Sequence, residues 1–503
     1  MKRDTAMRHY RWYSRGLGVV VMAMGLVFLL TTCKKQDERS GIVGKVMTGS
    51  SAATGATVYL YDASTFDENS VWSAPTAHAA IGVPYTPQAV FDWRRPDSPP
   101  VASVGVSGDG SFNFGGLSTG QYVIVAARDS VEWTDPVRAN LGGSKLDVGT
   151  IAMPHVTYFM SDTILQADAH WVAGEHYALM GRLTVGVGTT LTIDPGAVVR
   201  IAASGGTIYV LGAIHAVGTP DKFIRITSNE PTPGSGDWRS IAFSTGATPP
   251  LFRYCAFSYG DLAINSVVPG GRVEDCCFTH FVAEGLSLTG GPAGSDSVVV
   301  RGCSFENIPI SVYAGQELGR AMSIDHNAIY HASDFGVQLN TVRGGSVYCN
   351  FFYDCGREDT TQGHESGAMD LYEVSGLDIS HNDFDRSWYG FRIASRVDST
   401  TYIHHNRFYQ ISLCLYIGVL YPQLGPSYPT LRMNCIQVTE NFVYVDQCDY
   451  NRHAMDADSN YWEGLDGVSL ESRIHDCHDS PICPCVFHST VLGACPDAGV
   501  CNN

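Results

Sequence analysis

A short motif recurs nine times in the second half of the chain and restricts the fold more than any other feature. It consists of an apolar residue, two variable residues, one Asn or Cys, one variable residue and then an apolar or aromatic residue. The Asn or Cys falls at Cys255, Cys276, Cys303, Asn327, Asn350, Asn382, Asn406, Asn441 and Asn460. Repeats of about 20 to 50 residues are typical of solenoids. Each motif therefore predicts one coil of a three-sided solenoid, with surplus residues extruded as loops.

Stacking of the coils would place these nine positions above one another. Asn tolerates a left-handed backbone, and its side chain can bond to the same residue one coil away. Coils stack at about 4.8 Å, the spacing of hydrogen-bonded strands. We therefore expect a ladder buried in one bend of the solenoid. The residues two positions further on predict a core column of Phe257, Phe278, Phe305, Ile329, Phe352, Phe384, Phe408, Val443 and Trp462.

A second short strand is predicted in six coils, and its alternation predicts which side chains face water. These strands are 286–288, 310–312, 337–339, 369–371, 391–393 and 415–417, and the middle residue of each is expected to point outward. Asp370, Arg392 and Tyr416 then form one outward column on consecutive coils. The strand that precedes the motif adds Asp378, Tyr402 and His404 as further outward candidates.

These six outward side chains are the candidate site for glycan binding or catalysis. A carboxylate, a guanidinium and stacked tyrosines could hold a sugar chain, or supply the acid and base that cleave it. The same residues could equally form a solvated ion pair on an ordinary polar face. Both interpretations remain open at this stage.

The chain resembles a known family at both ends of the predicted solenoid. The passage from Leu183 through Gly218-Thr219-Pro220 to Asp237-Trp238, and the closing Asn460-Tyr461-Trp462, resemble right-handed parallel β-helix proteins of the pectin-lyase-like architecture. The resemblance implies a right-handed parallel β-helix over residues 154–490. It also implies an acidic polysaccharide as ligand or substrate, because secreted members often bind or cleave such polymers.

A smaller all-β domain is predicted before the solenoid, over residues 41–153 with a Pro-rich insertion at 65–100. Alternating apolar runs and the Asp109-Gly110 turn are typical of paired strands. The run 108–114, GDGSFNF, resembles the carboxypeptidase regulatory-like family of small sandwiches. This implies a spacer or stalk. The expected fold class is thus all-β, with a small Ig-like β-sandwich followed by the solenoid.

The N-terminal residues predict export. Residues 1–15 are basic and 16–30 are apolar, which is the pattern of a secretory signal. The apolar run ends at Thr32-Cys33, which resembles a bacterial lipobox. We expect a signal peptide over 1–32, lipid on Cys33 and a tether over 33–40, with an uncleaved anchor as the alternative. This predicts a lipid-anchored protein of the bacterial cell envelope, at the outer membrane or cell surface.

The cysteines predict disulfides near the C-terminus, which includes a Cys-containing tail over 491–503. Cys477, Cys483, Cys485, Cys495 and Cys501 are expected to form two disulfides among themselves, with one further partner elsewhere. Their spacing lacks the paired knuckles of structural zinc sites, so no metal is predicted. The three ladder cysteines are expected as stacked, buried thiols, although bridging between coils is also possible.

The net charge and the positions of the lysines disfavour two classes of function. A net charge of −18 disfavours nucleic acid as a partner. No lysine follows residue 222, which disfavours lyase families that use a lysine base. We predict a glycan or other cell-envelope ligand bound without catalysis and without a cofactor. The alternatives are a polysaccharide lyase or glycoside hydrolase, with calcium possible for a lyase, and a structural or adhesive rod.

Overall fold

The computed structural model describes residues 40–63, 91–96, 98–129, 132–203, 205–289, 296–315, 318–319, 322–356, 366–418, 428–438, 441–447, 455–465, 467–476 and 486–496. Several predictions lie outside these residues. They concern the signal peptide, Cys33, nearly all of the tether, most of the 65–100 insertion, and Cys477, Cys483, Cys485 and Cys501. Within the described part of the chain, no helix has the length and apolarity needed to cross a membrane.

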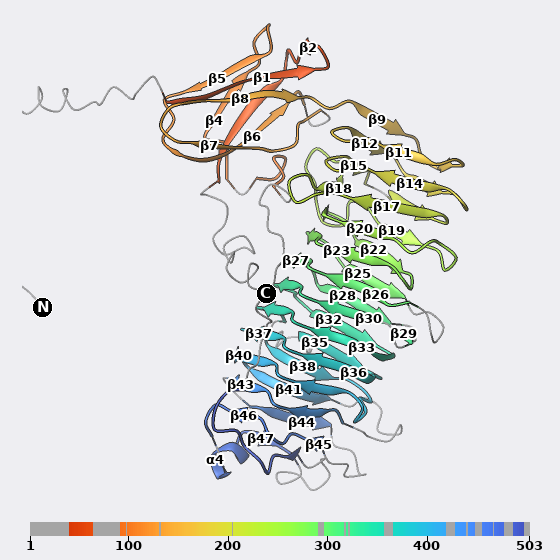
Figure 1. The fold of residues 1–503 in the computed structure, drawn as a ribbon, viewed down its shortest axis with the longest axis vertical. Helices are drawn as coiled ribbons and strands as arrows, with labels where there is room; N and C mark the ends of the chain where they lie inside the picture. Colours follow the sequence, from red (N-terminus) through yellow and green to blue (C-terminus); the bar gives the residue numbers. More distant parts are fainter. Residues whose placement is uncertain are drawn as a thin grey trace, which may run out of the picture.

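Two sheets form a β-sandwich at the N-terminal end of the described chain (Figure 1). The first contains β2 (Ser51–Ala52), β1 (Gly41–Thr48), β5 (Ser111–Gly115) and β8 (Lys145–Ala152). The second contains β4 (Ala102–Gly105), β3 (Thr57–Asp62), β6 (Gly120–Ala127) and β7 (Val137–Leu141). Alternate residues of both sheets, such as Ile42, Leu60 and Ile124, meet in one core.

Three long sheets form the solenoid, and the pairings within them are all parallel. Sheet C contains β9 (Val156–Phe159), β12 (His176–Leu179), β15 (Val198–Ile201), β18 (Ile224–Ser228), β21 (Cys255–Ser258), β24 (Cys277–Thr279), β27 (Ser304–Glu306), β31 (Ala328–Tyr330), β34 (Phe351–Tyr353), β37 (Asp383–Asp385), β40 (Arg407–Ile411), β43 (Cys435–Val438) and β46 (Tyr461–Trp462). Sheet D contains β10 (Thr163–Leu165), β13 (Arg182–Val185), β16 (Thr207–Val210), β19 (Ser240–Phe243), β22 (Leu262–Val267), β25 (Glu284–Thr289), β28 (Ile310–Gly315), β32 (Phe335–Asn340), β35 (Gly367–Tyr372), β38 (Tyr389–Ile393), β41 (Leu413–Gly418), β44 (Val443–Gln447) and β47 (Ile474–His475). Sheet E contains β11 (Ala169–Trp171), β14 (Thr190–Ile193), β17 (Ala213–Val217), β20 (Leu251–Arg253), β23 (Arg272–Glu274), β26 (Val298–Arg301), β30 (Met322–Asp325), β33 (Val342–Tyr348), β36 (Ser375–Ser380), β39 (Tyr402–His404) and β42 (Thr430–Arg432), and β29 (Leu318–Gly319) pairs with β33.

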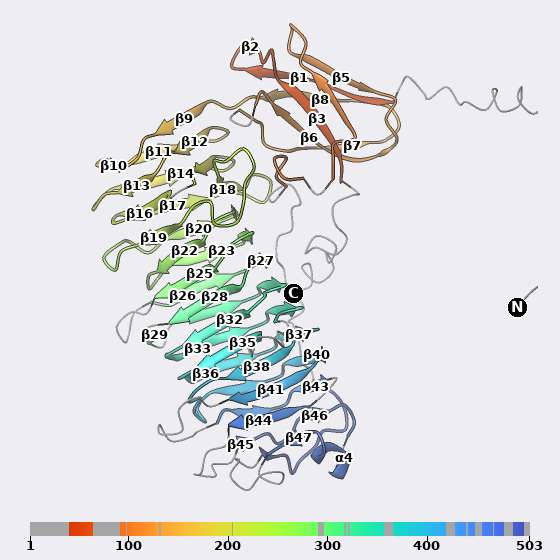
Figure 2. The ribbon, with the colours of Figure 1, turned by 180° about the vertical axis from the view of Figure 1, so that it is seen from behind.

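Each coil visits sheets C, D and E in turn, so the strands stack along one axis (Figures 1 and 2). The two-stranded sheet of β45 (Met455–Asp456) and β48 (Val486–Phe487) and the short helix α4 (Gly467–Glu471) lie at the C-terminal end. The predicted fold class is confirmed: a small β-sandwich precedes a right-handed parallel β-helix.

An asparagine ladder runs through the bend between sheets E and C. The backbone N–H of Cys303 donates to Oδ1 of Asn327, and the same contact repeats along the ladder at 2.9 to 3.0 Å. The ladder residues are Cys303, Asn327, Asn350, Asn382, Asn406, Asn434 and Asn460. Each Asn side chain also donates to a carbonyl one coil away, as Asn327 Nδ2 does to Val300 O. The ladder therefore pairs buried polar groups of neighbouring coils.

The prediction of Asn441 is wrong, and Asn434 is the ladder residue. Both 431–436 and 438–443 fit the motif, but only Asn434 bonds to Asn406 and Asn460. Asn441 lies just before β44, at the entry to sheet D. The core column changes accordingly, since Ile436 and not Val443 pairs with Phe408.

The left-handed backbone lies one residue before each ladder position, and not on the asparagine. Residues in this conformation have φ of 48° to 64° and are Tyr254, Asp275, Gly302, His326, Cys349, His381, His405, Met433 and Ser459. The asparagine is therefore used for its side-chain amide, and the preceding residue makes the bend. The same bend explains why His precedes Asn in three coils, because His is enriched in this conformation.

The side chains of the core column stack on one another from coil to coil. Phe257, Phe278 and Phe305 lie with ring centroids 4.8 Å apart, and Phe384 lies 4.9 Å from both Phe352 and Phe408. Small residues of sheet D face these rings. A Cβ on Gly285, Gly336 or Gly390 would lie within 3 Å of a core phenylalanine.

Ser311 occupies this small-residue position, which corrects the prediction that it faces water. It is fully buried, and Tyr313 is the residue in register with Ser287 and Gln338. β28 therefore begins at Ile310 as predicted, but its register with the neighbouring strands is shifted by two residues, so that 312–314 and not 310–312 aligns with 286–288.

The sandwich packs directly against sheet C. The buried Arg94 side chain donates to Ser228 O at 2.7 Å and pairs with Asp92 at 2.7 Å. Its guanidinium lies over the Trp133 ring, and Trp133 in turn packs on His176 of β12. The two domains therefore share a buried interface beside the first coils.

Candidate functional site

One candidate column lies on the outer face of sheet D. Gln338, Asp370, Arg392 and Tyr416 are in register on β32, β35, β38 and β41. Arg392 Nε donates to Asp370 Oδ1 at 2.9 Å, and Gln338 Nε2 donates to Asp370 Oδ2 at 3.0 Å. The structure brings Asp370, Arg392 and Tyr416 together on consecutive coils.

Asp370 and Tyr416 point outward from sheet D but are buried, contrary to prediction. Asp370 is 1% exposed and Tyr416 is 5% exposed, whereas the Arg392 side chain is 20% exposed. Burial raises the pKa of Asp370, although Arg392 and Gln338 oppose this shift. The Arg392 guanidinium also lies over the Phe335 ring at 4.9 Å. Arg392 is thus the accessible group of the pair, and Asp370 holds it in place.

A run of stacked rings continues from this column along the solenoid. Tyr389 and Tyr416 stack at 5.1 Å, Tyr416 and Tyr444 at 6.1 Å, and Tyr444 and His475 at 4.8 Å. Their planes differ by 20° or less, and they come from β38, β41, β44 and β47. We call these four rings the aromatic strip.

Sequence reasoning missed Tyr389, Tyr444 and His475. Tyr444 could have been found, because a ladder through Asn434 makes β44 the following strand and Tyr444 the residue in register with Tyr416. His475 follows from the same register through Tyr444. Tyr389 carries no such signal, because it lies at the start of its strand.

The other three candidates lie on sheet E. Asp378 and Tyr402 are in register on β36 and β39, and His404 is two residues after Tyr402. His404 Nε2 lies 3.2 Å from Asp378 Oδ1, and the Tyr402 ring stacks on His404 at 4.2 Å. His404 Nδ1 lies 2.8 Å from His405 Nδ1. Burial lowers the pKa of His404, although Asp378 opposes the shift.

The six candidate residues therefore form two separate groups and not one site. Asp370, Arg392 and Tyr416 belong to sheet D, and Asp378, Tyr402 and His404 belong to sheet E. Among the described residues, no group of three or more His, Cys, Asp or Glu side chains is placed to hold a metal ion.

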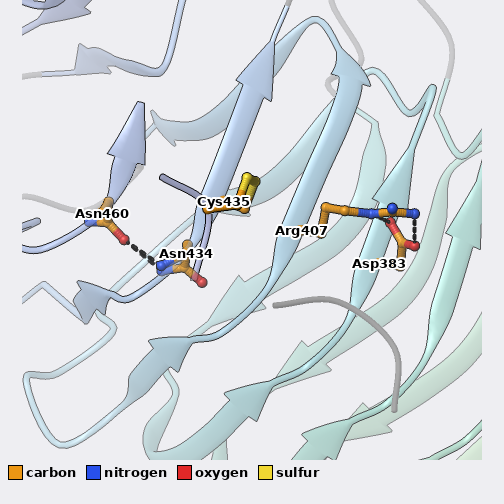
Figure 3. The surroundings of a disulfide bond; sticks show 6 residues. Asp383, Arg407, Asn434, Cys435 and Asn460 are labelled. Carbon is orange, nitrogen blue, oxygen red and sulfur yellow. Dashed lines mark hydrogen bonds and ion pairs between the residues drawn. A yellow bond between two sulfur atoms is a disulfide. The ribbon is translucent and has the colours of Figure 1, made fainter. Parts of the chain in front are cut away.

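A disulfide joins Cys435 of β43 to Cys495, with a Cα–Cα distance of 4.9 Å (Figure 3). Cys495 thus pairs outside the tail, and Cys349 is disulfide-bonded as well. Cys255, Cys276 and Cys303 are free and buried. Burial raises the pKa of the Cys276 and Cys303 thiols well above the ordinary value, which makes them poor nucleophiles.

Comparison with known proteins gives little further information. No protein family model and no curated protein matches the chain. A solved structure described as "a new PL6 alginate lyase complex with trisaccharide" matches 69% of this chain and 90% of its own, with 10% identity and a TM-score of 0.26. A similarity this low carries no argument, so the fold assignment rests on the strand pairing described above.

Proposed function

We propose that the protein is exported, anchored by lipid on Cys33, and binds an acidic glycan on the outer face of sheet D without cleaving it. The observation that carries the proposal is the aromatic strip of Tyr389, Tyr416, Tyr444 and His475 beside the partly exposed Arg392. The sheet E group is the second candidate, and a structural rod is the third.

The aromatic strip has the shape and chemistry of a surface that recognises sugar chains. Tyrosine presents a flat apolar ring with a polar edge, and a sugar ring is amphipathic in the same way. The rings lie on consecutive coils about 4.8 Å apart. Tyr416 is buried between its neighbours, so a linear chain along the solenoid axis would contact the half-buried rings of Tyr389, Tyr444 and His475. The guanidinium of Arg392 is a planar donor that matches a carboxylate, which favours an acidic sugar.

The same geometry favours binding over catalysis on sheet D. Asp370 is 1% exposed and already accepts hydrogen bonds from Arg392 and Gln338. A general acid or base must reach the proton that it transfers. The residues in register with Asp370 from β28 to β47 include no second carboxylate to complete an acid–base pair.

One observation favours catalysis at sheet E instead. The lowered pKa of His404 keeps its imidazole neutral near pH 7, and Asp378 orients the ring. A neutral, oriented imidazole beside a partly exposed tyrosine could abstract a proton from an acidic polysaccharide. This arrangement supports the lyase alternative.

Binding assays on variants test the main proposal. Arg392→Ala and Tyr444→Ala should each weaken binding to polyuronates about tenfold, because each removes one recognition element. Tyr409→Ala is the matched control, since Tyr409 is an exposed tyrosine on sheet C. Equal loss in the control, or no binding to any acidic polymer, would overturn the proposal.

A cleavage assay separates the two sites. Unsaturated products from a polyuronate that disappear in His404→Ala but persist in Arg392→Ala would establish the lyase alternative. The lipid anchor is tested separately by fatty-acid labelling, and label retained in Cys33→Ser would exclude that residue.

A further inference from the structure

A cavity of about 540 Å³ lies between the sandwich and the first coils of the β-helix. On the sandwich side it is lined by Arg138 of β7 and by Asp135, which lies just before that strand. The turns that precede β12, β15 and β18 line the other side, with Gly174, Gly196 and Lys222 among them. Its volume lies in the range of small-molecule sites, which run from about 300 to 1,000 Å³.

Three cationic side chains from two segments of the chain line this cavity. They are Arg138 of β7, Lys222 of the turn before β18, and Arg225 of β18. The chain as a whole is acidic, with 32 Lys and Arg against 50 Asp and Glu. Lys222 is the last lysine of the sequence, so the β-helix places its single lysine here.

Further cations lie at the same domain interface. Burial and the charges of Arg200, Arg94 and Arg225 together hold the pKa of the buried His176 well below its ordinary value. Burial and the charge of Arg94 also lower the pKa of Arg200 to about 10. A positive field of this kind concentrates anions.

The cavity also contains hydrogen-bond acceptors. Asp135 and Asp221 line it beside the three cations. Arg225 Nε lies 3.2 Å from Asp135 Oδ1, which is buried against it. The Asp135 side chain as a whole is 42% exposed, and Asp221 is exposed as well. A hydroxyl group in the cavity could therefore donate to the accessible part of either carboxylate.

We infer that this cavity binds a small hydroxylated carboxylate, the class to which sugar acids belong. Its carboxylate would lie against Arg138 and Lys222, and a hydroxyl would donate to Asp135. The ligand would contact both domains at once. The inference does not depend on the glycan surface of sheet D, which is formed by later coils.

Isothermal titration calorimetry of the full chain tests this inference with D-glucuronate, D-glucose, acetate and inorganic phosphate as probes. Glucuronate should bind about tenfold more tightly than glucose or acetate, since only glucuronate offers both the charge and the hydroxyls. Equal affinity for acetate or phosphate would reduce the cavity to an unspecific anion site and overturn the inference.

Variants of the cavity residues test whether glucuronate binds in this cavity. Lys222→Ala and Arg138→Ala should each weaken glucuronate binding about tenfold. Lys145→Ala, which removes an exposed lysine of β8 outside the cavity, should leave it unchanged. If Arg138→Ala does not fold, as judged by circular dichroism, Lys222→Ala still tests the inference, because it replaces an exposed side chain. Loss of binding in Arg392→Ala would assign the signal to sheet D and contradict the inference.

Discussion

Asn406 donates both its backbone N–H and its side-chain amide to Oδ1 of Asn434, at 2.9 and 3.1 Å. Asn434 makes the same contact with Asn460, as Figure 3 shows for the side-chain bond. Each of these asparagines is 0% exposed. One side chain therefore satisfies buried groups on two neighbouring coils, and its loss leaves several of them without partners.

Replacing one ladder residue should destabilise the β-helix strongly. Asn406→Ala removes the acceptor for Asn382 and the donor to Ile379 O. We expect a loss of about 2 to 4 kcal/mol in the free energy of unfolding, because buried polar groups remain unpaired. Asn441→Ala is the matched control and should cost less than about 0.5 kcal/mol. Equal losses in urea unfolding would show that the ladder does not contribute as described.

The sequence was sufficient for the architecture because the coils repeat a simple pattern. The alternation of Phe384 and its neighbours is enough to place the core column, and the register of Asp370 and Arg392 follows from it. Asn434 and Asn441 could not be separated, since both fit the motif and loop lengths vary between coils. Alternation also fixes the sheet face of Asp370 but not its burial, because burial depends on what lies over that face.

The ion pair between Asp383 and Arg407 should contribute more to the free energy of unfolding than an ion pair on the surface does (Figure 3). The Asp383 side chain is 3% exposed, and burial raises its pKa although Arg407 opposes the shift. Arg407→Ala leaves this carboxylate without its charge partner and should cost about 2 to 3 kcal/mol near pH 7. Arg386→Ala is the control: the Arg386 side chain is 57% exposed and its Nε lies 3.8 Å from Asp385 Oδ1, so its loss should cost less than about 0.5 kcal/mol.

The pH dependence of this variant provides an additional check. Loss of Arg407 raises the pKa of Asp383 in the folded state further, so the native protein takes up a proton more readily than the unfolded chain. The loss of unfolding free energy in Arg407→Ala, relative to the unmodified protein, should therefore be largest at neutral pH and should shrink as the pH falls toward 4. A deficit that stays constant from pH 7 to pH 4 would contradict this account.

The disulfide between Cys435 and Cys495 should stabilise the last coils. It spans 60 residues, which corresponds to about 4 kcal/mol in the chain-entropy description. Cys495→Ser should lower the melting temperature, and reductant should lower that of the unmodified protein toward the same value. If reductant lowered the melting temperature of Cys495→Ser equally, another disulfide would account for the effect.

Glu284 should make the protein less stable as the pH rises. Burial and the nearby Asp261 raise its pKa from 4.5 to about 7. Between these two values the folded chain binds a proton that the unfolded chain has released, so stability falls as the pH increases through this range. Glu284→Gln removes the ionisable group and should gain on the order of 1 to 2 kcal/mol at pH 8, since partial solvation screens some of the penalty. Below pH 4 the two proteins should unfold alike, because Glu284 is then protonated in both the folded and the unfolded state. Urea titrations at pH 4, 6 and 8 measure the difference, and a gain that does not vary with pH would show that the charge of Glu284 is not its source.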